Sequence, residues 1–244
     1  MKILGVIPAR YGATRFEGKL LAPILNKPMI LWTLDGARES ERLDEIIVAT
    51  DSELILKTVT DAGFKAVMTR DNHQSGTDRI WEVAENQDCT HVLNIQGDEP
   101  LLNGKTVDQL ISALDTKPDS KMVTMVTSLN PDEARDPNRV KVVIDENNRA
   151  LYFSRSLIPY PREISPDHSY LLHIGLYLYE KQFLREFIGH GLSDLEKIEK
   201  LEQLRALAMG VSIDIVHTTE KLMGVDAPDD ILQVESWLNR HQSA

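Results

Sequence analysis

Short apolar runs alternate along this chain with longer stretches in which apolar residues recur every three or four positions. The first pattern predicts buried strands, and the second predicts amphipathic helices that cover them. Within the first 115 residues we expect strands at 3–8, 44–50, 65–68 and 91–95, and helices at 29–40, 52–62 and 77–87. Alternation of this kind, with about 30 residues per strand–helix–strand unit, is typical of an α/β fold with a mostly parallel central sheet.

The pattern changes after residue 115, where strands follow one another with fewer helices between them. Strands are expected at 121–129, 140–145, 150–154, 173–179 and 212–216, a turn at 145–148, an exposed loop at 159–169, and helices at 194–209 and 229–240. The sequence contains no internal repeat and no obvious linker. We therefore expect one domain over residues 1–244, with a smaller β-containing lobe embedded at roughly 120–190.

The charge balance narrows the classes of function. The 244 residues include 38 Asp and Glu against 27 Lys and Arg, a formal net charge of −11. This surplus argues against nucleic-acid and anionic-membrane partners, which are held mainly by Lys and Arg. A single cysteine, Cys89, excludes an intrachain disulfide and a multi-cysteine zinc site. With no apolar run of membrane length, the sequence predicts a soluble, cytoplasmic protein.

The loop after the first predicted strand has the features of a phosphate-binding loop. Two glycines, Gly12 and Gly18, allow tight backbone turns, while Arg10 and Lys19 supply positive charge. It is not the Walker pattern, because Leu20 stands where that motif requires Ser or Thr. Taken alone, these cations fit an ordinary solvated loop equally well.

Two acidic segments complete the candidate chemistry. Asp98 follows the buried strand at 91–95, and Asp226 precedes a predicted helix. Carboxylates in such places can hold Mg²⁺ beside a phosphate, although each is also a common helix cap. Nucleotidyl transfer requires this combination: a glycine-containing loop that carries positive charge for the phosphates, and two carboxylates from separate segments that share a divalent ion.

Eight short motifs in order along the chain carry a resemblance to a known family. They are IPARY at 7–11, TR at 14–15 with GK at 18–19, HQSGTDR at 73–79, NIQGDEP at 94–100, LYFSR at 151–155, HIGLY at 173–177, LEQLR at 201–205 and GVD at 224–226. Together they resemble the 3-deoxy-manno-octulosonate (KDO) cytidylyltransferases of Gram-negative bacteria, from residue 3 to about 235. The resemblance implies a nucleotide-diphospho-sugar transferase (Rossmann-like) fold, CTP and Mg²⁺ as co-reactants, a homodimer, and a role in lipopolysaccharide biosynthesis.

The same resemblance implies roles for individual residues. It places Arg10 and Lys19 on the CTP phosphates, Arg70, Ser75, Gly76 and Gln96 around the nucleotide, Asp98 and Asp226 on Mg²⁺, and Arg155, His173, Tyr177, Glu202 and Gln203 on the sugar acid. Arg10, Lys19, Asp98 and Asp226 are thereby the implied catalytic residues, and the lobe at 120–190 the implied sugar-binding and dimerisation region. From the residues alone, His173 and Tyr177 are ordinary core residues. The implied reaction is attack of the sugar C2 hydroxyl on the α-phosphorus of CTP, which releases pyrophosphate.

Several positions depart from the family pattern. Glu17 and Leu20 stand where the family usually has proline, and Leu178 and Glu180 where it more often has Gly and Arg. The added carboxylates suit an ammonium group, so the 8-amino-8-deoxy analogue of KDO is a second expected substrate.

Two alternatives stay open. A CMP-sialate synthetase or a methylerythritol-phosphate cytidylyltransferase would share the fold, but the motifs at 153–155 and 201–205 favour an octulosonate enzyme. A non-catalytic nucleotide-binding module is the other. The joint presence of Arg10, Lys19, Asp98 and Asp226 argues against it, because a pure binder needs no metal bridge at the α-phosphate.

Overall fold

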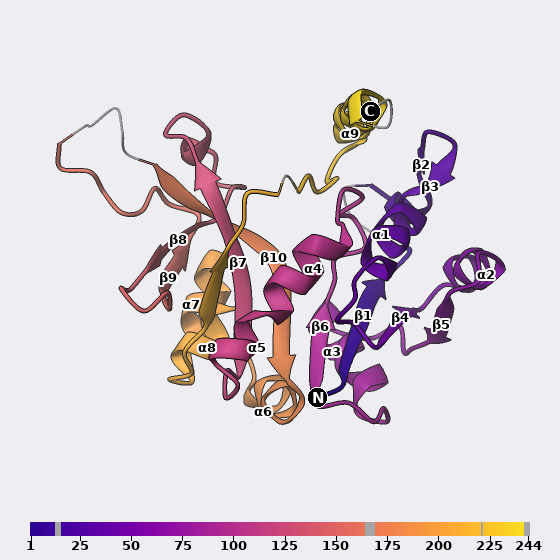
Figure 1. Cartoon of the computed structure of the whole chain (residues 1–244), viewed down its shortest axis with the longest axis horizontal. Helices are drawn as coiled ribbons and strands as arrows, with labels where there is room; N and C mark the ends of the chain where they lie inside the picture. Colours follow the sequence, from indigo (N-terminus) through magenta and orange to yellow (C-terminus); the bar gives the residue numbers. More distant parts are fainter. Residues whose placement is uncertain (13–15, 164–168, 221, 242–244) are drawn as a thin grey trace. The chain divides into compact units, whose positions relative to one another are not determined.

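The computed structural model describes residues 1–12, 16–163, 169–220 and 222–241 and divides into two compact units (Figure 1). The first unit comprises residues 1–108 and 221–244, and the second comprises residues 109–220. The expected lobe at 120–190 falls inside the second unit. None of the described helices combines the length and the apolar character needed to cross a bilayer.

The first unit is built on a parallel sheet, as the strand–helix alternation predicted. Its strands are β1 (Ile3–Ala9), β4 (Glu45–Thr50), β5 (Lys65–Met68) and β6 (His91–Asn94), in the spatial order β6-β1-β4-β5. The connecting helices are α1 (Met29–Arg38), α2 (Glu53–Asp61) and α3 (Gly76–Ala84). The α/β fold with a mostly parallel central sheet is therefore confirmed.

The order of the strands determines where a ligand can bind. Strand β1 pairs with β4 on one side and with β6 on the other, so the direction in which the sheet grows reverses beside β1. In open α/β sheets a crevice forms at such a reversal, outside the carboxyl ends of the strands. The loops after β1 and β6, which hold the predicted phosphate loop and Asp98, both begin at this edge.

The C-terminal helix α9 (Pro228–His241) packs within the first unit against a small hairpin, β2 (Pro23–Ile24) and β3 (Lys27–Pro28). The contact has an apolar core of Ile24, Met29, Leu101, Val225, Val234 and Leu238. Glu235 also accepts a hydrogen bond from the backbone N–H of Leu25 at 2.8 Å. The segment before α9 is thereby held close to the loop that follows β6.

Two further helices were not predicted from the sequence. They are α4 (Gly104–Ile111) and α5 (Ala113–Thr116), and the boundary between the two units falls inside α4.

The second unit holds a mixed sheet. Its strands are β7 (Met122–Leu129), β8 (Lys141–Ile144), β9 (Ala150–Ser154), β10 (Tyr170–Glu180) and β11 (Asp214–His217), in the order β11-β7-β10-β8-β9. Only β11 and β7 run parallel among these pairs. A 3₁₀ turn, Glu133–Arg135, precedes β8, and helix α6 (Lys181–His190), which was not predicted, follows β10.

The helix predicted at 194–209 is wrong as one continuous element. The structure has α7 (Asp194–Glu199) and α8 (Leu204–Ala208), separated by Lys200 in the left-handed conformation with φ 55°. The break lets the guanidinium of Arg205 fold back onto the buried carboxylate of Glu196, at 2.6 and 2.9 Å. Residues nine apart lie on opposite sides of a continuous helix, at about 100° per residue, so this ion pair requires the break.

Candidate functional site

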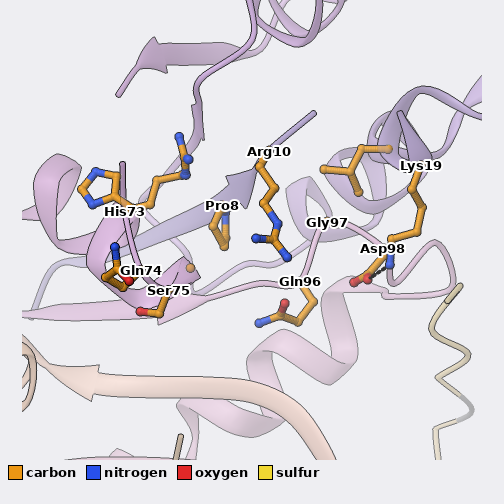
Figure 2. Close-up of a pocket in the computed structure, with 12 residues that line it drawn as sticks. Pro8, Arg10, Lys19, His73, Gln74, Ser75, Gln96, Gly97 and Asp98 are labelled. Atoms are coloured by element: carbon orange, nitrogen blue, oxygen red, sulfur yellow. Dashed lines mark hydrogen bonds and ion pairs between the residues drawn. The ribbon is translucent and has the colours of Figure 1, made fainter. Parts of the chain in front are cut away.

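A cavity of about 290 Å³ opens in the first unit at the carboxyl edge of the parallel sheet (Figure 2). It is lined by Pro8, Arg10, Lys19, Leu20, His73, Gln74, Ser75, Gly76, Arg79, Gln96, Gly97 and Asp98. Six of the eight residues predicted to bind nucleotide, phosphate or metal are in this set: Arg10, Lys19, Ser75, Gly76, Gln96 and Asp98. The structure thus brings together residues that are up to 88 positions apart in the chain.

The loop after β1 places its two cations on different walls of the cavity. Gly18 adopts a left-handed conformation with φ 68°, and its N–H donates to the carbonyl of Tyr11 at 3.0 Å. The chain then enters a 3₁₀ turn, Lys19–Leu21, in which Leu20 is buried. Figure 2 shows Arg10 leaving the end of β1 near Gln96, while Lys19 reaches Asp98 from the turn.

The N-terminus of α3 forms another wall. Ser75 and Asp78 make a capping box, in which each side chain accepts a hydrogen bond from the other residue's backbone N–H. The buried Arg79 ties α3 to the ends of two strands, because it donates to Asp51 after β4 and to Thr69 after β5. Ser75 and Gly76 therefore sit on a rigid wall.

Arg70 is not among the residues that line this cavity. Its side chain is 68% exposed, and its Nε and backbone N–H both donate to the carboxylate of Glu82 on α3. His73, which does line the cavity, bonds the same carboxylate through Nε2. Burial opposes the charge on Glu82, but the hydrogen bonds from His73 and Arg70 hold its pKa below the ordinary value. Sequence reasoning gave His73, Gln74, Arg79 and Glu82 no role, although the first three lie in the motif at 73–79.

Both predicted metal ligands meet at Lys19. The Lys19 ammonium lies 2.5 Å from Oδ2 of Asp98 and 3.5 Å from Oδ1 of Asp226. Asp226 reaches this point because Val225 is fully buried and its N–H donates to the carbonyl of Asp98 at 3.0 Å. Asp230, in the first turn of α9, accepts hydrogen bonds from the N–H groups of Asp226 and Ala227, both at 2.8 Å, and so fixes the segment that carries Asp226.

A third acid behind this pair was missed from the sequence. Burial, reinforced by the charges of Asp98 and Asp226, raises the pKa of Glu99 to about 8, and its Oε2 is buried without a hydrogen-bond partner among the described residues. Gly224 packs against it, since a Cβ there would lie 3.0 Å from Oε1. The adjacent acids at 98 and 99, directly before a proline, were the available signal.

The acids fit a magnesium ion that depends on its substrate for further ligands. Two carboxylate oxygens converge on one cation, and a third carboxylate lies behind them with an unsatisfied oxygen. Over the part of the chain that the structure describes, no three His, Cys, Asp or Glu side chains gather around one metal position. Mg²⁺ is usually held in this way, by one or two carboxylates together with waters and substrate phosphates.

Three of the five predicted sugar-binding residues, His173, Tyr177 and Glu202, come together within the second unit. Opposite β7, strand β10 is irregular between Ile174 and Tyr177, where the pairing register shifts. The Thr124 hydroxyl lies in this irregularity, within 3.1 Å of the carbonyls of Ile174 and Leu176 and of the His173 ring. The rings of His173 and Tyr177, four residues apart, consequently approach to 5.3 Å between centroids, where a regular strand would separate them by about 13 Å.

Glu202 and Gln203 lie in the turn between α7 and α8. The charge of Glu202 adds to burial in raising the pKa of Tyr177. Gln203 is 4% exposed, and its Nε2 has no partner among the described residues. An unsatisfied buried donor is costly, so Gln203 marks a place where a ligand oxygen or a water fits.

Arg155, the fifth residue, is engaged by the protein. Its Nε donates to the carbonyl of Glu199 at 2.8 Å and its Nη1 to the carbonyl of Pro137 at 3.1 Å. Its backbone N–H donates to the Glu199 carboxylate at 3.0 Å. Part of the guanidinium fork predicted to grip a sugar carboxylate thus holds the ends of α7 and the loop before β8.

The packing of His173 predicts a pH-dependent stability. Burial lowers the pKa of His173 to about 3, so the folded state favours the neutral ring. Its contribution is complete above about pH 6.5 and is lost as the pH falls from 6.5 towards 3. Between pH 7 and pH 5 we expect the unfolding free energy of the wild type to fall by about 1–2 kcal/mol more than that of H173F. Urea titrations at both pH values measure this difference, and parallel curves for the two proteins would contradict it.

Comparisons with known proteins agree with this arrangement of residues. The cytidylyltransferase family model matches residues 4–214. A 3-deoxy-manno-octulosonate cytidylyltransferase from Fusobacterium nucleatum is 45% identical over 243 residues, covering 99% of this chain and 98% of the relative. A 3-deoxy-manno-octulosonate cytidylyltransferase from Flavobacterium johnsoniae is 42% identical, covering 98% of this chain and 99% of the relative. A solved CMP:2-keto-3-deoxy-manno-octonic acid synthetase complexed with CTP superposes with a TM-score of 0.94 at 37% identity, over 98% of this chain and 99% of the other. The chain belongs to the 3-deoxy-manno-octulosonate cytidylyltransferase family.

Proposed function

We propose that this chain transfers the cytidylyl group of CTP to a 3-deoxy-octulosonate sugar acid, giving the CMP-sugar and pyrophosphate. The observation that carries the proposal is a cavity at the carboxyl ends of β1 and β6 that is lined by Arg10, Lys19 and Asp98, with Asp226 paired to Lys19 at 3.5 Å. Family membership supports the same reaction and, with it, the role in lipopolysaccharide biosynthesis.

The positively charged and the acidic residues of the first unit have different proposed roles. Arg10 and Lys19 attract the polyphosphate and stabilise charge on the departing pyrophosphate. Ser75, Gly76 and Gln96 line the cavity where the nucleoside would lie. Asp98 and Asp226 would hold Mg²⁺, which when bound draws charge from the α-phosphate and lowers the pKa of the attacking hydroxyl. No covalent enzyme intermediate is needed, because positioning and charge neutralisation supply the catalysis.

The second unit supplies the residues proposed for the sugar. Glu202 and Tyr177 offer a carboxylate and a phenol near one another, and Gln203, the next residue after Glu202, offers an unsatisfied amide N–H. These groups suit the hydroxyls of a sugar acid. Arg155 carries the positive charge that pairs with its carboxylate.

The departures from the family pattern bear on which sugar is used. Leu178 is buried in the core, Glu180 is partly buried at the end of β10, and Glu17 is exposed. None of the three belongs to the cluster of His173 and Tyr177. We therefore propose KDO as the main substrate and the 8-amino-8-deoxy analogue as the second candidate.

The deciding experiment measures pyrophosphate release with CTP and Mg²⁺ against three acceptors: KDO, its 8-amino analogue and N-acetylneuraminic acid. We expect kcat/KM to be highest for KDO. A higher value for the 8-amino analogue would move the assignment to that sugar, and turnover of N-acetylneuraminic acid would favour a sialate enzyme. Folded protein that binds CTP but turns over none of the three would exclude the proposed acceptor class.

A homodimer, located in the cytoplasm, completes the proposal. Large apolar side chains lie exposed on the second unit: Leu151, Tyr160, Leu192, Leu195 and Ile198 are between 42% and 84% exposed. Helix α7 carries two of them and is tied to the end of β9 by the hydrogen bond from Ser154 to Glu199. We take these apolar side chains as the surface of the second unit that is available for self-association, and sedimentation of the purified chain gives its mass directly.

A further inference from the structure

The ammonium of Lys19 occupies the position where the two metal-binding carboxylates converge. It lies 2.5 Å from Oδ2 of Asp98 and 3.5 Å from Oδ1 of Asp226, and only 14% of its side chain is exposed. Figure 2 shows the Lys19–Asp98 pair at the end of the cavity, away from the wall that carries His73 and Ser75. In this arrangement Lys19 neutralises the acids instead of pointing freely at a phosphate.

We propose that Lys19 is a resident counter-ion: it holds Asp98 and Asp226 together in the nucleotide-free protein and competes with a divalent cation for their oxygens. The inference rests on the proposed function for the identity of the metal and the nucleotide. It assigns Lys19 a second role, besides phosphate binding, in the same site.

Competition follows from distance and charge. A Mg²⁺ or Mn²⁺ ion bonds carboxylate oxygens at about 2 Å, so it would sit within a few ångströms of an ammonium that shares those oxygens. Two cations that close repel one another. Either the ammonium leaves the carboxylates or the metal binds weakly.

The backbone and the side chain of Lys19 allow that movement. The turn Lys19–Leu21 is anchored by buried Leu20 and by the hydrogen bond from the N–H of Gly18 to the carbonyl of Tyr11. The four-carbon side chain can nevertheless swing its ammonium while the Cα stays in place. A triphosphate in the cavity would offer Lys19 new oxygens and offer the metal additional ligands. Nucleotide and metal should therefore strengthen each other's binding.

Without Lys19 the acids would lack their nearest cation. Asp98 and Asp226 both lie within 3.5 Å of the Lys19 ammonium, so their carboxylates would face one another without a cation between them. Asp98 and Asp226 would then attract an added divalent cation more strongly, because no other cation among the described residues lies within 4.0 Å of either carboxylate. A residue that merely binds phosphate would leave metal affinity unchanged when removed.

The test is titration of Mn²⁺, read by the electron paramagnetic resonance signal of the free ion, into nucleotide-free protein. We expect K19M to bind Mn²⁺ at least tenfold more tightly than the wild type. K57M, which removes a lysine from the exposed pair with Asp61 at 2.7 Å, should match the wild type. Equal or weaker Mn²⁺ binding by K19M would overturn the proposal. Should K19M not fold, as judged by circular dichroism, K19Q carries the same comparison.

A second titration separates this proposal from the proposed function. CTP should tighten Mn²⁺ binding to the wild type by a larger factor than to K19M, because part of its effect is to draw Lys19 away. If CTP changes neither protein while K19M still binds Mn²⁺ more tightly, the counter-ion role stands and the nucleotide assignment fails. If CTP tightens Mn²⁺ binding equally in both proteins, the exchange of Lys19 from carboxylate to phosphate is wrong.

Discussion

D98N is expected to lower kcat for pyrophosphate release by several orders of magnitude while the protein stays folded. Asp98 supplies the oxygen closest to Lys19, lies at the cavity edge and anchors Val225 through its backbone carbonyl. The backbone contact survives the substitution, but the charge that is proposed to hold a cation at the reacting phosphate is lost. A thousandfold loss corresponds to about 4 kcal/mol of transition-state stabilisation.

Its matched control is D88N, at a fully exposed acid of the same unit that pairs with Lys2 at 3.7 Å. D88N should keep wild-type kcat, and both variants should melt within a few degrees of the wild type. Removing the charge of Asp98 should also lower the pKa of Glu99 from its raised value of about 8, because that charge adds to the effect of burial. A D98N enzyme with more than about a tenth of the wild-type rate at saturating Mg²⁺ would contradict the metal role, since tenfold is only about 1.4 kcal/mol.

R205M should cost about 3–5 kcal/mol of unfolding free energy, the largest stability loss that we expect from one substitution in the second unit. The Arg205 guanidinium grips Glu196 through Nε at 2.9 Å and Nη2 at 2.6 Å, and it packs over the ring of Phe187. Both charged side chains are less than 10% exposed. Methionine fills most of the volume but leaves the Glu196 carboxylate buried without its cation.

Two further variants separate charge from packing in this prediction. K197M removes an exposed pair with Asp194 on the same helix, 3.0 Å apart, and should change stability by less than about 0.5 kcal/mol. E196L/R205M should recover most of the loss, because apolar replacement of a buried ion pair is often neutral. Recovery stays incomplete, since Glu196 also accepts from the N–H of Ser193 in a capping box. Urea unfolding measures the free energy of unfolding of R205M, K197M and E196L/R205M. Equal losses of unfolding free energy in R205M and K197M would contradict the prediction.

The sequence by itself determined the α/β class and most of the strands. Strands such as β1 and β4 are apolar on both faces, and buried parallel strands leave that signal in any context. The sequence also predicted a turn and two helix ends. The turn at 145–148 forms with Asn148 at φ 55°, and Gly63 and Gly210 end helical segments with positive φ. The site residues in the loops after β1 and β6 followed from motif and position, because strand ends face one edge of a parallel sheet.

Only the tertiary structure decided which side chains meet. The predicted helix at 194–209 breaks at Lys200 because the buried pair of Glu196 and Arg205 outweighs a favourable helical pattern. The irregularity in β10 that joins His173 to Tyr177 depends on Thr124 from another strand. Lys19 meets Asp226 only because Val225 is buried in a core built from both ends of the chain. The spacing of apolar residues along a helix or strand shows which face of that element is buried. The contacts named here form between different elements, so no local sequence pattern predicts them.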